Sequence, residues 1–550
     1  MTGTQDDSTR PVPSKRSFQE GAAMQPDRRR PWSYPHRTRF GLGSGRQGSA
    51  RLSPMMQSVN MTSHKGISSY WLDREGLCTG TLIFGVGMRN EPPTLAGITH
   101  LVEHLLLRMV QPVTVPHGGT VNTDSLQFYA SGRPDDVAGF LNAIAAAAAK
   151  LEAVTEENLT LEKSVLEAED PHKFSTVSGG LLTYRYGTNG VGAAHFGAPG
   201  TAGLTKAEIS EWASRWLTSG NAALTFTGPL PASLDLRLPP AVPVKRHQDP
   251  PLITTPTLIM SRKQGIALSL LVPSRDARLL GGALQYELLL RLRHSRGLIY
   301  SVESLTTPID THQSQLDLIL DPLPANTVSA LREALGALRG IAEAGFSEDA
   351  VQSTRHALVS ELGWDDFVPQ DYLDQLAIDA LLNRSTPDRQ ELLDRAAAMS
   401  SAELTKILKS SMASLIVALD KSVKLSKTVA EKLGLTIDRY EIWQRHHNLE
   451  NHHRTEERDA EYPAWRHKSS HDTLTLTPTR LIWRDSGKTK AISLADVAVV
   501  GNRSCGCISL MDRRGRSSEL SMDDWKANKK LRRKLLGAFP PEIIRSFPED

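Results

Sequence analysis

The sequence predicts an α+β protein in which two tandem domains of like topology precede a small, β-rich C-terminal domain. The main observation is an internal repeat: the apolar stretch 137–144 recurs at 328–335, an offset of 191 residues. The acidic start of the following helix, 155–157, recurs at 347–349 with an offset of 192. Each copy then ends in a strand-like segment. A repeat of this length indicates a repeated architecture, and strands mixed with amphipathic helices indicate the α+β class.

Composition divides the chain into six segments. We expect a disordered basic tail (1–58), a first domain (59–230), a Pro-rich linker (231–256), a second domain (257–438), a polar linker (439–470) and a small terminal domain (471–545). The tail is rich in Arg, Pro, Ser and Gly, and it holds too few apolar side chains to build a core. The first 58 residues are therefore expected to contribute nothing to the folded site.

Charge and cysteine content exclude several classes of function. The 550 residues carry a formal net charge of +3, which is too small to favour nucleic acid as the main partner. No run of 18 apolar residues and no apolar signal segment is present, so we expect neither a transmembrane segment nor secretion. The three cysteines, Cys78, Cys505 and Cys507, cannot form a disulfide framework. These features favour a cytoplasmic protein.

The first domain contains a spacing typical of a metal site. A strand at 79–86 and a polar connection lead to a helix that carries His100, Glu103 and His104. On a helix, histidines four residues apart project from one face and can bind one ion, and a neighbouring carboxylate can take a proton from water. Zinc suits histidine nitrogens. The alternative is a buried amphipathic helix whose histidines only pack, and this stretch alone leaves the two interpretations open.

A third ligand is sought in the acidic helix that begins after Thr155. Glu162 and Glu169 lie seven residues apart, two turns along one face, and either one can complete a site with two histidines. The stretch also contains Glu167 and Asp170, so a solvated acidic face is the competing interpretation. Between the two helices, residues 120–130 suit a strand beside the site.

The second copy lacks the histidine motif and carries hydrogen-bond donors instead. Arg293 ends a long apolar helix and Tyr300 opens a strand. A surface arginine and a packed strand tyrosine explain these two residues equally well. Divergence of one copy toward donors, while the other keeps a metal motif, indicates that both halves face one site.

The terminal segment shows several short strands and one closing helix. We expect the strands at 473–477, 480–484, 491–500, 507–512 and 518–522, and the helix at 523–537. Such a run is similar to a pleckstrin-homology-like (PH-like) domain. The helix is rich in lysine and arginine, which is more typical of a solvated face than of a weak contact with acidic lipid or protein.

Together, these residues resemble the pitrilysin-type or insulinase-like zinc peptidases, whose motif runs H-x-x-E-H. The resemblance covers residues 68–420 and is strongest for the short, two-domain, bacterial or processing-peptidase-like branch. It implies that zinc is bound by His100, His104 and Glu169, and that Glu162 supports these ligands.

The resemblance also implies roles in peptide hydrolysis. Glu103 would activate a zinc-bound water, while Arg293 and Tyr300 would stabilise the oxyanion. The strand from Asn122 to Phe128 would hold the peptide substrate as an added strand. A homodimer is implied because one chain carries both the motif and the Arg/Tyr segment, with a heterodimer of related subunits as the alternative. Competing functions are a catalytically silent subunit and an adaptor that acts with a partner.

Overall fold

The structure is a computed structural model of the whole chain. It describes residues 59–169, 177–195, 200–241, 250–261, 263–362, 369–441, 462–485 and 488–547. All of these belong to one compact unit, Arg46–Asp550. The tail predicted to be disordered, 1–58, and most of the predicted polar linker lie outside the described residues. None of the helices in the described part of the chain is long and apolar enough to cross a membrane.

The first domain is built on a six-stranded sheet with the order β1-β2-β6-β3-β5-β4. Its strands are β1 (Asn60–His64), β2 (Ile67–Trp71), β3 (Cys78–Phe84), β4 (His117–Val121), β5 (Leu126–Gly132) and β6 (Ala222–Phe226). The single strand predicted at 120–130 is wrong. A turn at 122–125 divides it into β4 and β5, because the backbone N–H of Asn122 donates to the carbonyl of Ser125 at 2.8 Å. β4 is consequently an edge strand, and β5 lies inside the sheet.

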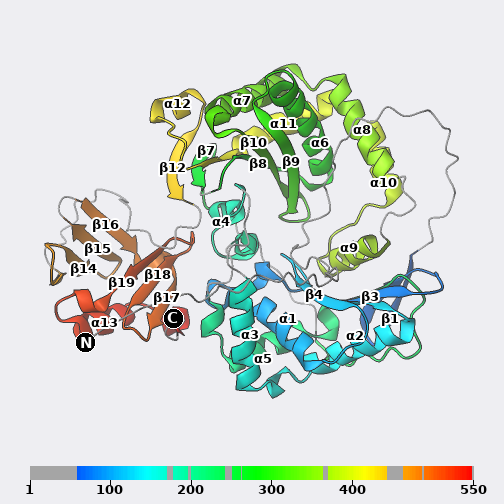
Figure 1. Cartoon of the computed structure of the whole chain (residues 1–550), viewed down its shortest axis with the longest axis horizontal. Coiled ribbons are helices and arrows are strands. Elements are labelled where there is room, and N and C mark those ends of the chain that lie inside the picture. Colours follow the sequence, from blue (N-terminus) through cyan, green and yellow to red (C-terminus); the bar gives the residue numbers. More distant parts are fainter. Residues whose placement is uncertain are drawn as a thin grey trace, which may run out of the picture. The chain divides into compact units, whose positions relative to one another are not determined.

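Four helices gather on one face of this sheet (Figure 1). They are α1 (Ile98–Met109), α2 (Pro134–Ala148), α3 (Glu156–Glu169) and α5 (Lys206–Trp216). Their apolar stripes and the inner face of the sheet form one buried cluster, which includes Leu82, Leu101, Val102, Phe140 and Trp212. The helix with the histidine motif is therefore held by the core of the first domain.

The second domain repeats this sheet, with the order β12-β7-β11-β8-β10-β9. Its strands are β7 (Thr257–Ser261), β8 (Ile266–Pro273), β9 (Ile299–Pro308), β10 (Gln313–Pro322), β11 (Ile416–Asp420) and β12 (Thr436–Glu441). The β2–β6 and β7–β11 pairs are parallel, whereas the three following pairs are antiparallel in both sheets. The two sheets differ in the edge strand beside β2 and β7. In the first sheet this strand, β1, comes before the other strands in sequence, whereas in the second sheet it is β12 and comes after them. The predicted α+β fold with two like domains is confirmed.

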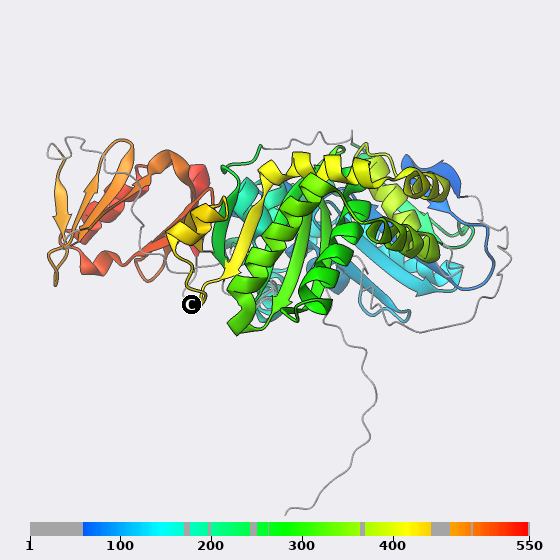
Figure 2. The ribbon, with the colours of Figure 1, turned by 90° about the horizontal axis from the view of Figure 1, so that it is seen from above.

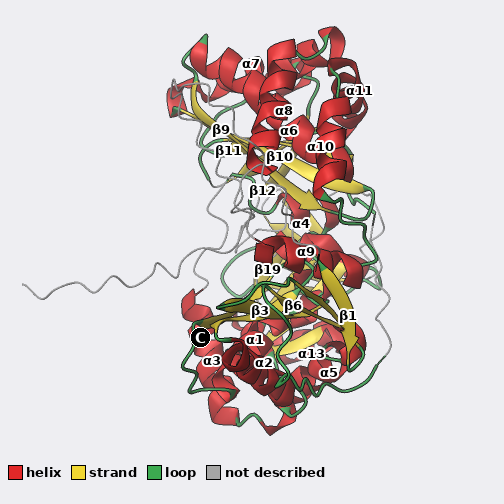
Figure 3. Cartoon of the chain, turned by 90° about the vertical axis from the view of Figure 1, so that its right-hand side faces the viewer, coloured by secondary structure: helices red, strands yellow, loops and turns green. Residues whose placement is uncertain are grey.

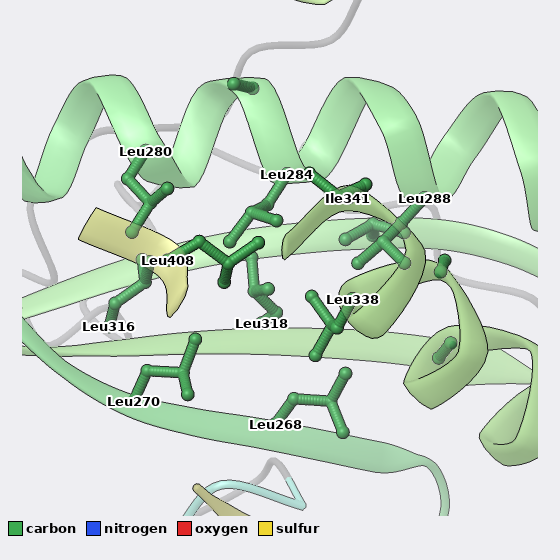
Figure 4. Packing of buried hydrophobic residues seen from close by; sticks show 14 of the residues in the cluster. Leu268, Leu270, Leu280, Leu284, Leu288, Leu316, Leu318, Leu338, Ile341 and Leu408 are labelled. Carbon is green, nitrogen blue, oxygen red and sulfur yellow. The ribbon is translucent and has the colours of Figure 1, made fainter. Parts of the chain in front are cut away.

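Helices again cover one face of the second sheet (Figure 3). They are α6 (Ala277–Leu288), which continues into a π-helical turn at Leu289–His294, α7 (Thr327–Ala344), α8 (Glu348–Leu362), α10 (Arg389–Ala398) and α11 (Ser401–Ser411). Figure 4 shows leucines of α6, such as Leu280 and Leu284, pointing toward Leu268 of β8 and Leu318 of β10. All four are fully buried.

Each domain also contributes one helix to the other domain. This helix packs on the face of the sheet that does not carry that domain's own helices. Helix α4 (Leu181–Tyr186) comes from the first half of the chain, and Leu181 and Tyr184 pack with Ile259 and Ile416 of the second sheet. Helix α9 (Pro369–Leu381) comes from the second half and packs against β2, β3 and β6. This exchange covers the sheet faces that the domains' own helices leave open.

The C-terminal domain contains two four-stranded sheets, β13-β14-β15-β16 and β19-β18-β17-β20 (Figure 2, orange to red). Its elements are β13 (Ala464–Arg466), β14 (Thr473–Leu476), β15 (Arg480–Asp485), β16 (Lys488–Ser493), β17 (Val497–Arg503), β18 (Ile508–Asp512), β19 (Ser517–Leu520), α13 (Asn528–Leu536) and β20 (Ile544–Phe547). The predicted strand 491–500 is wrong, because a 3₁₀ turn at Leu494–Asp496 divides it between the two sheets. A final strand, β20, follows the helix and pairs in parallel with β17.

Candidate metal centre

Helix α1 begins at a site that fixes its first turn. Gly97 adopts a left-handed conformation with φ of 94°, which glycine reaches without strain. The buried carboxylate of Glu91 accepts from the backbone N–H groups of Gly97 at 2.7 Å and Thr99 at 2.9 Å. An anion at this position satisfies unpaired N–H groups and complements the positive end of the helix dipole. The histidines one and two turns later therefore sit on a rigid support.

His100 and His104 converge with Glu169 of α3. The imidazole centroids are 4.8 Å apart, and the Oε2 atom of Glu169 lies 3.9 Å from Nε2 of His100 and 3.4 Å from Nε2 of His104. Tetrahedral zinc with bonds of about 2.0–2.1 Å places its donor atoms about 3.4 Å apart. Among the described residues, these three side chains are the group whose donor atoms could hold a metal ion. Two imidazoles and one carboxylate fit zinc and leave a fourth position for water or substrate.

Glu162 orients His104 from the side opposite the metal position. Its Oε2 atom lies 3.0 Å from Nδ1 of His104, and the carboxylate is buried. A hydrogen bond from Nδ1–H to this carboxylate leaves the Nε2 lone pair directed at Glu169. Arg108 also contacts Glu162, through Nε and Oε1. Sequence reasoning missed Arg108, although its position four residues after His104 places it on the same helix face.

Glu103 lies beside the cluster and against the edge strand. Its carboxylate is buried, and Oε2 is 3.8 Å from Nε2 of His100. Gly119 of β4 faces it so closely that a Cβ atom there would lie 2.6 Å from Oε1 of Glu103. Glycine at 119 therefore lets the backbone of β4 approach the carboxylate, an approach that sequence spacing alone did not reveal.

Asn122 and Phe128, the two residues predicted to bind substrate, make contacts within the first domain. Phe128 is fully buried in β5 and packs edge to face on Phe84, with ring centroids 6.4 Å apart. Its side chain therefore packs in the core, whereas the role predicted for Phe128, as part of a strand that pairs with the peptide backbone, stays a prediction. The carbonyl of Asn122 accepts from the backbone N–H of Met88 at 3.1 Å. Edge strand β4, rather than the 122–128 stretch, presents backbone groups at the side of the sheet.

Arg293 and Tyr300 lie together on the second domain. The guanidinium of Arg293 is 5.1 Å from the ring centroid of Tyr300, which is 72% exposed. Tyr300 lies near the start of β9, whereas Pro308 at its end accepts a hydrogen bond from Arg89 of the first domain at 2.9 Å. Eight residues of strand span about 26 Å. The contact with Arg89 therefore lies at the opposite end of β9 from Tyr300.

Comparison with known proteins shows the fold. No protein-family model matches the chain, and no curated protein matches it in sequence. Among solved structures, a protease from Helicobacter pylori matches with a TM-score of 0.55 and 15% identity, covering 66% of this chain and 99% of the other. The first half of the periplasmic protease PqqL from Escherichia coli matches with a TM-score of 0.55 and 14% identity, covering 68% of this chain and 95% of the other. An inactive peptidase M16 domain from Pseudomonas fluorescens matches with a TM-score of 0.54 and 14% identity, covering 67% of this chain and 99% of the other. The chain thus has the fold of M16 peptidases, which includes both proteases and an inactive domain.

Proposed function

We propose that this chain is a zinc-dependent endopeptidase of the M16, or pitrilysin-like, superfamily that hydrolyses short or unfolded peptides. One observation carries the proposal: His100, His104 and Glu169 converge on one point while the carboxylate of Glu103 lies beside them. The fold shared with M16 proteases supports the same conclusion. A zinc ion bound there would supply Lewis acidity to the peptide carbonyl and to the attacking water.

The chain's own residues provide proton transfer and substrate placement. Glu103 accepts the proton of the attacking water and delivers it to the leaving amine, as a positioned general base and acid. Edge strand β4 has no partner strand on one side in the part of the chain that the structure describes, so a peptide can pair with it and present its carbonyl beside Glu103. Recognition of this kind reads the peptide backbone and therefore favours extended, unfolded substrates.

We also propose that two copies form the complete site. Tyr300 is highly exposed, and Arg293 and Tyr300 lie on the domain without the metal cluster. In a homodimer, these donors can reach the cluster of the other copy and stabilise the oxyanion; a related second subunit is the alternative. The absence of a disulfide among Cys78, Cys505 and Cys507 is compatible with our proposal of a cytoplasmic location.

Digestion of a peptide mixture, read by mass spectrometry, tests the activity. Zinc-loaded wild-type protein should cleave, and Glu103→Gln should keep zinc but lose about 10²–10⁴-fold in rate, because it cannot transfer the proton. Glu167→Gln is the matched control, since Glu167 is an exposed carboxylate on α3 outside the cluster. Equal cleavage by wild type and Glu103→Gln would overturn the proposal.

A catalytically silent subunit or adaptor is the second candidate, because one structural match is an inactive domain. Zinc binding without cleavage by the wild type would favour it.

Deletion of 440–550 tests the role of the C-terminal domain. A truncated protein with full peptidase activity would assign the C-terminal domain a role in weak contact with a partner protein or membrane surface rather than in catalysis.

A further inference from the structure

We propose that Arg108 is a positioning residue for the metal centre, and that it acts by holding Glu162 in the orientation that aligns His104. This inference rests on the proposed zinc site, and it assigns a role to a side chain outside the ligand set. Arg108 contacts Glu162 through its Nε atom.

Both oxygens of Glu162 are engaged by α1. Oε2 faces Nδ1 of His104 at 3.0 Å, and Oε1 accepts from Nε of Arg108. His104 and Arg108 are four residues apart and stand one turn from each other on the same helix face. Glu162 reaches this row from α3, and its side chain is 6% exposed. The carboxylate thus has one orientation that satisfies both neighbours.

Arg108 is needed because a buried carboxylate requires more than a neutral imidazole as a partner. Burial of an ionised carboxylate is costly unless a cation compensates it. The Arg108 side chain is 36% exposed, so water screens the attraction in part, but its planar guanidinium still fixes the direction of the contact. Without Arg108, Glu162 loses the partner of Oε1 and can rotate away from Nδ1. The imidazole of His104 would then lose its fixed direction toward Glu169.

The second domain supplies an internal comparison. With the repeat offset of 192, Thr354 of α8 takes the place of Glu162. Gly282 of α6 faces it, since a Cβ at 282 would lie 2.9 Å from Cγ2 of Thr354. Gly282 thus takes the place of His104, which faces Glu162 in the first domain. Tyr286 lies four residues after Gly282, as Arg108 lies four residues after His104, and so takes the place of Arg108. Histidine, glutamate and arginine are therefore absent together in the second domain, as expected if the three residues act as one unit.

Zinc affinity, measured by competition with a chromogenic chelator, tests this role independently of peptide cleavage. Arg108→Met should weaken zinc binding by about 10–100-fold, the usual cost of losing a residue that supports a metal ligand. Arg108→Lys should recover part of the loss, because it restores the charge without the planar fork. Arg133→Met is the matched control, since Arg133 is an exposed arginine of the same domain. Circular dichroism confirms that each variant is folded at the assay temperature.

A double-mutant cycle separates positioning from general destabilisation. Arg108→Met should cause no further loss of zinc affinity in a Glu162→Gln protein, because its effect passes through that carboxylate. Additive losses, or wild-type affinity in Arg108→Met, would overturn the role of Arg108 while leaving the zinc site intact. A folded wild-type chain that binds no zinc would instead overturn the proposed peptidase function, and this inference with it.

Discussion

The two domains place different chemistry at the same point of one fold. In the first domain, Glu169 at the end of α3 faces two histidines of α1. In the second, Glu361 near the end of α8 forms an ion pair with Arg278 of α6. Arg278 lies four residues before Gly282, as His100 lies four residues before His104. The carboxylate is thus kept in both copies, but its partner changes from imidazoles to a guanidinium.

This difference separates what the fold needs from what the site needs. An arginine carries its own positive charge and satisfies the carboxylate permanently. Imidazoles would instead leave the positive charge to be supplied by a metal ion bound at the proposed site. The second domain is as well packed as the first, so the metal cluster is not required for folding. This contrast supports our proposal that the cluster serves function rather than folding.

The largest expected effect comes from exchanging the two carboxylates for amides, one at a time. Glu169→Gln removes an anionic ligand and should lower zinc affinity and peptide cleavage by at least about 10²-fold, since ligand changes exceed the 10–100-fold range of supporting residues. Glu361→Gln should leave cleavage unchanged, because it removes only a half-exposed ion pair. Equal losses in the two variants, measured by zinc content and initial rates, would contradict the assignment.

A smaller effect is expected from adding one methyl group to each domain. In Gly119→Ala the new Cβ meets Glu103, so the general base shifts and cleavage should fall by about 10²-fold, the cost of a misplacement near 1 Å. In Gly282→Ala the Cβ meets Thr354, which should lower the free energy of unfolding by about 1–3 kcal/mol. Cleavage by this variant should change little. Rates and thermal unfolding measured side by side distinguish them. Loss of activity in Gly282→Ala without unfolding would show that the contact between α6 and α8, and not only Arg293 and Tyr300, serves the chemistry.

The sequence predicted those parts of this comparison that are encoded locally. The offset of 191–192 residues revealed the repeat, and the spacing of His100 and His104 revealed one face of a helix. The choice of Glu169 rested on resemblance, because the exposed acids of α3 look alike in sequence. Spacing could not reveal that Gly119 meets Glu103, since a turn between β4 and β5 brings them together. The exchange of α4 and α9 was also missed, because short helices that pack on a distant domain leave no periodic signal of their destination.

The exchanged helices also differ in charge. Helix α4 buries Arg185, which donates to Gln315 at 3.0 Å and to the carbonyl of Ser414 at 3.0 Å, and burial lowers its pKa to about 10. Helix α9 buries Asp374, which lies 2.5 Å from the hydroxyl of Thr225. Burial, and to a lesser extent the nearby charge of Asp371, raise the pKa of Asp374 to about 7. One domain therefore contacts its neighbour through a cation that stays charged near neutral pH, and the other through a carboxyl group that titrates there.

The last expected effect concerns stability alone and depends on pH. Because the pKa of Asp374 is higher in the folded chain than in the unfolded one, its contribution to stability decreases as pH rises from about 4 to 7 and then levels off. Asp374→Asn removes this dependence, so the difference in Tm between variant and wild type should increase over that range. The corresponding change in the free energy of unfolding should amount to a few kcal/mol at most, at about 1.4 kcal/mol per pKa unit. A Tm difference that is constant with pH would refute the account of Asp374.

Titration of the metal-free chain with zinc, followed by peptide cleavage at each step, tests the central claim most directly. We predict that cleavage rises in proportion to zinc and stops rising at one ion per chain, because within the described ranges of the chain the first domain alone holds such a cluster. Glu103→Gln should bind the same single ion and cleave nothing. Cleavage in the complete absence of metal would contradict the claim. So would a cleavage rate that saturates with zinc while His100, His104 and Glu169 do not bind the ion.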